Sequence, residues 1–162
     1  MQRRTLLRIG LFGPLALAAG GALIVAGADA ARGRESVLRA TAPILLAGAL
    51  PEAGPARAAA IDATLAAVGR ALAGLPADTR RELDQAFALL STRAGRVATG
   101  GPFVDWAAAE PAAIERMLSR WRFHAMAAMQ AFYHALHDLT LSSFYADESR
   151  WAAIGYPGPL EL

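Results

Sequence analysis

Residues 61–76 read IDATLAAVGRALAGLP and decide the fold class of this chain. Their large apolar side chains recur at intervals of four, three, four and three residues, which places one apolar stripe along an α-helix. The stripe consists of Ile61, Leu65, Val68, Leu72 and Leu75. A glycine and then a proline end the pattern, as is common at helix C-termini. The stretch therefore predicts an amphipathic helix.

The rest of the chain extends this pattern to an all-α fold. Alanine is the commonest residue and the strongest helix former, and runs of strand-forming residues are missing. We expect further helical segments at residues 36–50, interrupted by Pro43; at residues 77–93; at residues 111–146, as one helix or as two with a bend near Phe123; and at residues 148–154, between Asp147 and Gly155. Gly95, Gly100, Gly101 and Pro102 predict a loop, and Asp105 is expected to cap a further turn. The expected architecture is a bundle of four to six helices.

The charge distribution excludes a nucleic-acid-binding domain. The chain has 16 basic and 14 acidic residues, and the excess lies in residues 1–30, which hold three arginines and one aspartate. The remainder holds 13 arginines and 13 carboxylates, so it has no net electrostatic attraction for nucleic acid. With no cysteine, the chain also lacks disulfides, iron–sulfur clusters and thiolate metal sites.

The N-terminus reads as an export signal. Residues 1–8 are MQRRTLLR, and residues 9–28 are apolar apart from glycines and one proline. A basic start and an apolar middle are typical of a secretory signal. The run resembles the twin-arginine motif, with Arg3 and Arg4 as the pair and Leu6 and Leu7 in its apolar positions. An incidental arginine pair in an ordinary secretory signal is the alternative.

We place the signal segment at residues 1–30 and the helical domain at residues 31–162. Small residues at 26–28 and 28–30 offer two cleavage positions, while the apolar stretch is also long enough to remain as a membrane anchor. The expected location is therefore periplasmic or membrane-associated, reached through the twin-arginine translocase. Any contact with the membrane is expected through the signal segment.

Two histidines are the only candidate for metal chemistry. His134 and His137 lie three residues apart on an expected helix, with Asp138 four residues after the first. Two imidazoles and a carboxylate can hold a metal ion, although an ordinary solvated helix face has the same composition. Isolated His124 is expected beside the bend instead.

The sequence contains no nucleophile elbow, P-loop or dinucleotide fingerprint. We therefore predict no catalytic residue, no metal site and no cofactor-binding residue in this chain. Proteins that use the twin-arginine route mainly carry a cofactor that was inserted in the cytoplasm. The mismatch between such a signal and a chain without a cofactor site indicates that the cofactor is bound by a partner.

The C-terminal stretch is a candidate for partner binding. Residues 144–159 read FYADESRWAAIGYPGP, which concentrates aromatic residues, glycines and prolines near a chain end. Tyrosine and tryptophan are favoured interface anchors. The candidate residues are Tyr145, Trp151, Gly155, Tyr156, Pro157, Gly158 and Pro159. The alternative is a tail that folds back over the bundle and lays Trp151 and Tyr156 on its surface.

Taken in order, these elements resemble the gluconate 2-dehydrogenase subunit 3 family. The resemblance rests on the twin-arginine start, a helix ending at Leu50-Pro51, a helical pair, a glycine-rich loop leading to Phe103, a helix ending in Leu118 and Trp121, and above all the motif from Phe144 to Pro159. It implies a non-catalytic small (gamma-type) accessory subunit of a flavin-dependent sugar or alcohol dehydrogenase of the glucose–methanol–choline type.

In such a complex the FAD belongs to a large flavoprotein subunit, and a c-type cytochrome often accepts the electrons. The small subunit carries the signal that exports the folded catalytic subunit and supports its maturation. The competing hypotheses are a free-standing periplasmic helical protein with a ligand between its helices, and a metal-binding protein that uses His134 and His137.

Overall fold

The apolar stripe of residues 61–75 lies on helix α4 (Pro55–Ala73) and its C-terminal flank in the computed structural model, which describes residues 29–158. Val68 and Leu72 are buried on the core side of α4, and Ile61 and Leu65 are half-buried beside them. Thr64 is also buried on this face, where its hydroxyl donates to the Ala60 carbonyl at 2.7 Å. The predicted amphipathic helix is confirmed.

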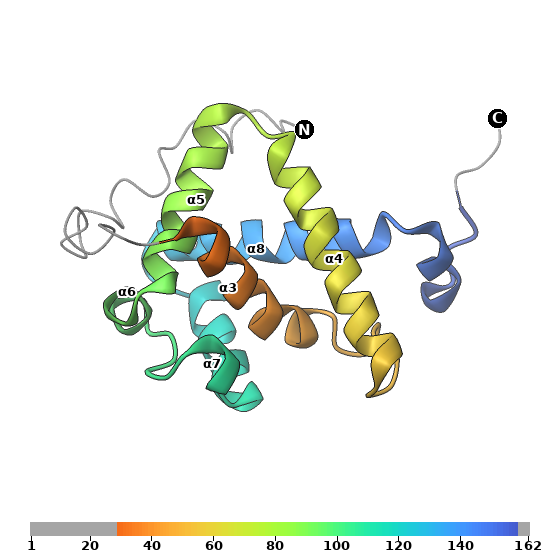
Figure 1. Cartoon of the computed structure of the whole chain (residues 1–162), viewed down its shortest axis with the longest axis horizontal. Coiled ribbons are helices and arrows are strands. Elements are labelled where there is room, and N and C mark those ends of the chain that lie inside the picture. Colours follow the sequence, from red (N-terminus) through yellow and green to blue (C-terminus); the bar gives the residue numbers. More distant parts are fainter. Residues whose placement is uncertain (1–28, 159–162) are drawn as a thin grey trace.

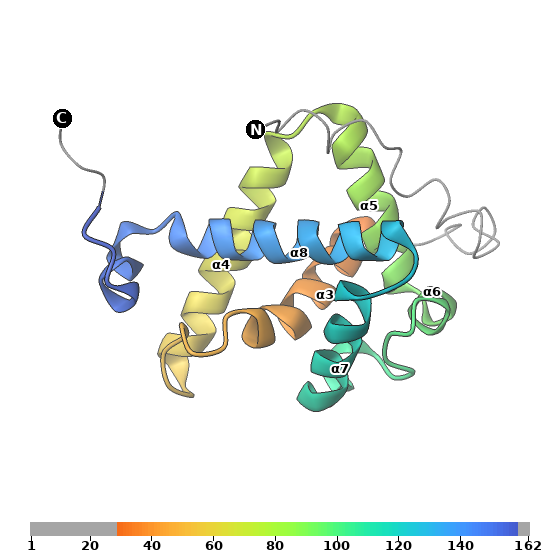
Figure 2. The same cartoon turned by 180° about the vertical axis from the view of Figure 1, so that it is seen from behind.

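The described residues form an all-α bundle of six α-helices and three short 3-10 turns, with no strand among them (Figures 1 and 2). In chain order the other elements are α3 (Ala30–Leu45), α5 (Ala77–Ser91), α6 (Arg93–Ala98), η1 (Trp106–Ala108), α7 (Pro111–Arg122), α8 (Ala127–Tyr145), η2 (Glu148–Arg150) and η3 (Ala152–Ile154). The all-α fold and the number of helices agree with the sequence-based expectation.

Helix α3 begins six residues before the position expected from its apolar pattern. Asp29 has an extended backbone, and its carboxylate accepts the Arg32 amide at 3.0 Å, which starts the helix at Ala30. Pro43 lies in the last turn, and the helix ends at Leu45 rather than at residue 50. Asp29 and Ala30, placed with the signal segment above, are thus the cap and first residue of α3.

The loop expected at Gly95 is instead part of a short helix. Helix α5 stops at Ser91, two residues earlier than expected, because Thr92 turns to an extended backbone and its hydroxyl accepts the Gly95 amide at 3.0 Å. Gly95 permits close packing here, since a Cβ at this position would lie 2.0 Å from the Leu89 carbonyl oxygen. The glycine was wrongly interpreted as a helix breaker.

Residues 111–146 form two helices, which resolves the open alternative. Helix α7 ends at Arg122 and α8 begins at Ala127. His124 lies in the connection, where its Nδ1 accepts the Met126 amide at 3.0 Å and its carbonyl accepts the Gln130 side chain at 2.8 Å. The prediction that this histidine flanks the bend is confirmed.

The core lies where α3, α4, α5, α7 and α8 meet, and α4 contributes Val68 and Leu72 to it. At its centre Phe132 of α8 packs edge-on against Phe87 of α5 and Trp121 of α7, with ring centroids 5.7 and 5.5 Å apart. In Figure 2 α8 runs across the bundle, and it contacts α4, α7 and α3. Each such large apolar side chain stabilises the fold by roughly 1.5–3 kcal/mol through burial.

A second, smaller cluster lies toward the C-terminal end of α8. There Phe144 packs with Ala42 and Leu46 from the end of α3. Among residues 29–158, no helix combines the length and the apolar composition needed to cross a bilayer.

Candidate functional site

The candidate partner-binding residues form a small structure beyond the end of α8, here called the C-terminal unit (residues 147–158). In Figures 1 and 2 it extends outward from α8 and does not fold back over the other helices. Two 3-10 turns, η2 and η3, replace the single helix expected at residues 148–154. The alternative of a tail that folds back over the bundle is therefore wrong for the described part of the segment.

Asp147 starts this unit, as the sequence predicted. Its Oδ1 accepts the Ser149 amide at 3.1 Å and the Ser149 hydroxyl at 2.6 Å, and its Oδ2 accepts Arg150 Nε at 3.2 Å. The Ser149 hydroxyl and then Arg150 lower the pKa of the Asp147 carboxyl, because both stabilise its ionised form. At the other end Gly155 adopts a left-handed backbone with φ of 70°, the predicted left-handed cap.

Trp151 is the centre of the C-terminal unit. Its indole Nε1 donates to the Tyr145 carbonyl at 2.8 Å, and its backbone carbonyl accepts the Tyr156 amide at 3.0 Å. The Tyr156 ring packs edge-on against the indole at 5.2 Å, and Gly158 lies so close that an added Cβ would be 3.7 Å from it. The half-buried indole thus packs against residues of its own segment and of the last turn of α8.

Arg150 links the unit to the bundle. Its guanidinium lies 4.0 Å from the centre of the Phe144 ring, and its side chain is 16 % exposed. This stacking joins the unit to the second apolar cluster, because the Phe144 ring that Arg150 contacts belongs to that cluster. No local pattern predicts this contact, although Arg150 and Phe144 both lie within the motif that carries the family resemblance.

The unit presents its apolar surface outward. Ile154 is 54 % exposed and Tyr156 is 46 % exposed. Gly155 and Pro157 are exposed as well, whereas Tyr145 is half-buried against Phe144. Gly158 is half-buried beneath Trp151. Of the predicted partner-binding residues, Pro159 lies outside the described residues, as do Arg3, Arg4, Leu6 and Leu7 of the export signal.

The histidines on α8 are not brought together with further ligands. His137 Nδ1 lies 2.9 Å from Asp138 Oδ1, and the His137 ring stacks on Tyr133. His134 contacts the edge of the same tyrosine and is exposed. Within residues 29–158 no three histidine or carboxylate side chains are grouped closely enough to hold a metal ion.

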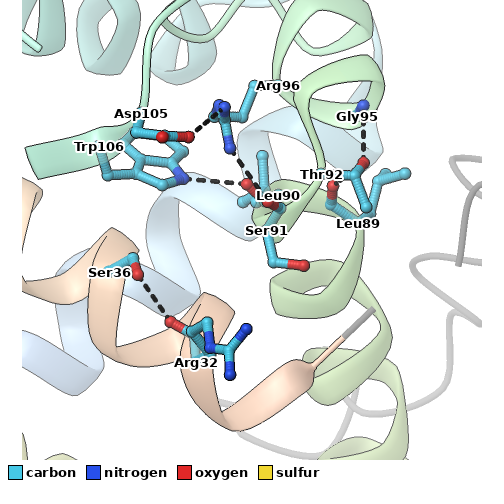
Figure 3. A network of polar contacts seen from close by, with 10 residues as sticks. All are labelled: Arg32, Ser36, Leu89, Leu90, Ser91, Thr92, Gly95, Arg96, Asp105 and Trp106. Atoms are coloured by element: carbon cyan, nitrogen blue, oxygen red, sulfur yellow. Dashed lines mark hydrogen bonds and ion pairs between the residues drawn. The ribbon is translucent and has the colours of Figure 1, made fainter. Parts of the chain in front are cut away.

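A buried arginine that the sequence analysis did not single out organises the opposite end of the molecule (Figure 3). Arg96 is only 4 % exposed, and its guanidinium donates to the Ser91 carbonyl at 3.0 Å and to Asp105 at 2.7 Å. Asp105 therefore pairs with this guanidinium instead of capping η1 as expected. Beside it Trp106 donates to the Leu90 carbonyl at 2.9 Å.

A groove of about 440 Å³ runs between α3, η1 and the start of α7. Its floor is apolar and includes Ile44, Trp106 and Ile114, and Glu35 and Arg39 lie at its edge. The two charged groups are paired with each other at 3.3 Å, and Arg39 also bonds Asp62 at 2.8 Å. The hydrogen bond to Asp62 raises the pKa of Arg39, which stays ionised.

Comparison with known proteins adds no relative: the chain matches no protein-family model, no curated protein and no solved structure.

Proposed function

We propose that this chain is a non-catalytic small (gamma-type) accessory subunit of a periplasmic or membrane-associated flavin-dependent sugar or alcohol dehydrogenase. It carries the twin-arginine signal that exports the folded catalytic subunit and supports the maturation of that subunit. The FAD belongs to the large subunit, and a c-type cytochrome is a further candidate member of the complex. The proposal is supported by the signal motif at Arg3 and Arg4, the family resemblance, and the exposed, ordered apolar side chains of the C-terminal unit.

The C-terminal unit is the observation that carries this proposal. A protein-binding element needs exposed apolar groups that are already ordered, because ordering them on binding costs free energy. Ile154 and Tyr156 are exposed, and their backbone is held by the Trp151 carbonyl and indole contacts. The unit extends beyond α8, so a large partner can cover it without displacing a helix.

The experiment is co-purification of the large flavoprotein subunit with tagged full-length chain. Cutting an interface anchor to alanine typically costs about 2 kcal/mol or more, or roughly thirtyfold in affinity. We expect this loss for Tyr156→Ala, with a smaller loss for Ile154→Ala. Phe123→Ala is the matched control, since that ring is 73 % exposed at the other end of the molecule.

Two results would count against the accessory-subunit proposal. If no flavoprotein accompanies the wild-type chain, the whole assignment fails. If the flavoprotein accompanies wild type and Tyr156→Ala equally well, the partner binds elsewhere and only the docking site is wrong.

Export is tested separately in the N-terminal signal. Replacing Arg3 and Arg4 together by lysine keeps both charges but removes the planar guanidinium pair that a receptor would recognise. We expect the double variant and its flavoprotein to remain in the cytoplasm. Their normal appearance in the periplasm would contradict a twin-arginine route.

The groove favours a second candidate function, a free-standing periplasmic protein that binds an apolar small molecule. Its volume of about 440 Å³ falls in the range of ligand pockets, and its floor is apolar with charged groups at one edge. Ile44→Trp would fill the groove and abolish such binding while leaving co-purification with a flavoprotein unchanged. A small apolar molecule extracted from wild type but not from this variant would establish the second function.

A further inference from the structure

We propose that the end of the bundle opposite the C-terminal unit rests on an anionic membrane surface. This basic apolar end consists of residues 93–104, which include α6 and the loop after it, and residues 116–126, which include the end of α7 and the α7–α8 turn. In Figure 2 α6 and the α7–α8 turn lie on the right, and the C-terminal unit lies on the left. The inference does not depend on the identity of the enzyme partner.

Exposed apolar side chains are concentrated at this end. Phe123 and Phe103 are 73 % and 65 % exposed, and both lie in connections between helices rather than on a helix face. Val97, Val104 and Met126 are also at least 41 % exposed. Within residues 29–158 the other large apolar side chains with comparable exposure are Ile154 and Tyr156 of the C-terminal unit. Aromatic side chains on protruding loops suit insertion at a membrane interface.

The same end is basic although the domain as a whole is neutral. Neither residues 93–104 nor residues 116–126 contain an aspartate or glutamate, yet together they hold five arginines. Arg96 is buried and paired with Asp105, whereas Arg93, Arg116, Arg120 and Arg122 are exposed. None of these four forms an ion pair with a carboxylate among the described residues. Four exposed guanidinium groups around apolar side chains complement anionic lipid headgroups.

Hydrogen bonds join the two segments into one surface. Trp121 Nε1 donates to the Thr99 carbonyl at 2.7 Å, and Arg120 donates to the Gly100 carbonyl at the same distance. Because Trp121 is buried in the core, the loop after α6 is held beside the end of α7. Cation–π contacts place charge next to each exposed ring, with Arg93 3.9 Å from the Phe103 ring centre and Arg122 5.2 Å from that of Phe123.

The start of the folded domain lies beside this surface. In the first turn of α3, Gly33 approaches α5 so closely that an added Cβ would lie 3.0 Å from Ser91 Cβ, and α6 begins two residues later at Arg93. Figure 3 draws Arg32 of α3 in the same neighbourhood as Ser91 and Arg96. The apolar sequence of residues 9–28 therefore joins the domain next to its basic apolar end. A chain that enters from a membrane at this point brings that end to the lipid surface.

The test uses full-length chain reconstituted in vesicles through its own N-terminal segment. Phe103, Phe123 and Tyr156 are replaced in turn by the photo-crosslinking analogue p-benzoylphenylalanine, and lipid adducts are identified by mass spectrometry. Vesicles of phosphatidylcholine alone are compared with vesicles that also contain phosphatidylglycerol. We expect abundant lipid adducts from positions 103 and 123 when phosphatidylglycerol is present, and few from position 156.

The contribution of charge is measured with Arg93→Gln and Arg122→Gln in the chain that carries the probe at position 103. Each basic residue near an anionic surface contributes about fivefold in membrane occupancy, so the double variant should lose most of its phosphatidylglycerol-dependent adducts. Arg57→Gln, in the first turn of α4 and outside the basic apolar end, is the control and should have no effect. Circular dichroism verifies that each variant is folded.

Three results would overturn the proposal. Equal lipid adducts at all three probe positions would show that the domain is tethered without a preferred face. Adducts at positions 103 and 123 that do not depend on phosphatidylglycerol would remove the role of the arginines. Adducts to a protein rather than to lipid, in membranes from cells that make the whole complex, would assign this end to a protein partner.

Discussion

The two ends of the molecule both expose aromatic side chains, but they are built in different ways. The basic apolar end is tied to the core by two tryptophans, Trp106 and Trp121, which are 4 % and 1 % exposed, and by the buried Arg96. The C-terminal unit is organised around the half-buried Trp151, which contacts its own segment and the last turn of α8. One end therefore shares the stability of the bundle, and the other is a local structure.

This difference has a consequence for function. A segment with few buried contacts can open locally at a small free-energy cost, whereas a segment fixed to the core opens only with the whole domain. The C-terminal unit can therefore adjust to a partner while the helices stay folded. The basic apolar end presents its side chains on a rigid frame, which suits a flat surface such as a bilayer.

The largest effect should come from removing a core tryptophan at the basic apolar end. Trp121→Ala leaves a cavity beside Phe132 and removes the hydrogen bond to the Thr99 carbonyl. We expect the free energy of unfolding to fall by about 3–5 kcal/mol, measured by urea denaturation. A loss as small as that of a surface substitution would mean that this end is not tied to the core.

Gly95→Ala should have the next largest effect. The added Cβ would lie 2.0 Å from the Leu89 carbonyl oxygen, so α6 must move away from α5, at a cost of about 1–3 kcal/mol in the free energy of unfolding. Gly69→Ala on α4 is the matched control, because nothing lies within 4 Å of its added Cβ. That control should raise the free energy of unfolding by about 0.5–1 kcal/mol. Opposite signs for the two variants are the diagnostic result.

Trp151→Ala should lower global stability by only about 1 kcal/mol, although it removes the same type of side chain as Trp121→Ala. Its effect should be local: amide hydrogen exchange should accelerate in residues 147–158 and remain unchanged in α5 and α7. A fall in global stability that matches Trp121→Ala would show that the C-terminal unit belongs to the core, and the contrast between the two ends would disappear.

The smallest effect concerns pH and the cap of the C-terminal unit. Because the pKa of Asp147 is lowered in the folded chain, its contribution to the unit is present above the ordinary aspartate pKa of 3.8 and is lost as the pH falls through the lower folded value. NMR signals of the Trp151 indole should therefore shift toward those of an opened unit in this acidic range. Asp147→Asn retains an acceptor for Ser149 but does not titrate. In this variant the Trp151 indole signals should therefore show no acid-dependent shift.

Local patterns in the sequence were enough for most of the helices. The stripe on α4 depends on the spacing of residues along one helix, and Pro55 and Gly74 mark its ends in the chain itself. The cap at Asp147 and the left-handed glycine at Gly155 were predicted for the same reason, since both are properties of a few consecutive residues.

Where the sequence-based prediction failed, contacts between distant segments were responsible. Gly95 is needed because α6 packs closely against α5. The sequence alone does not distinguish a glycine that permits such close packing from a glycine that breaks a helix. The break between α7 and α8 has no proline or glycine, so the sequence left open whether residues 111–146 form one helix or two with a bend near Phe123. Arg96 could not be distinguished from the solvated arginines, because its partners Ser91 and Asp105 meet it only when the loop closes.

The sequence by itself determined the all-α class, the main amphipathic helix and the caps of the C-terminal segment, because each is specified by neighbouring residues or by composition. Tertiary structure alone decided that the C-terminal unit stands beyond α8, that the histidines meet no third ligand within the described residues, and that two segments free of acidic residues share one surface. Such features depend on hydrogen bonds and packing between residues far apart in the chain, and the spacing of residue types along a sequence does not encode which of these contacts form.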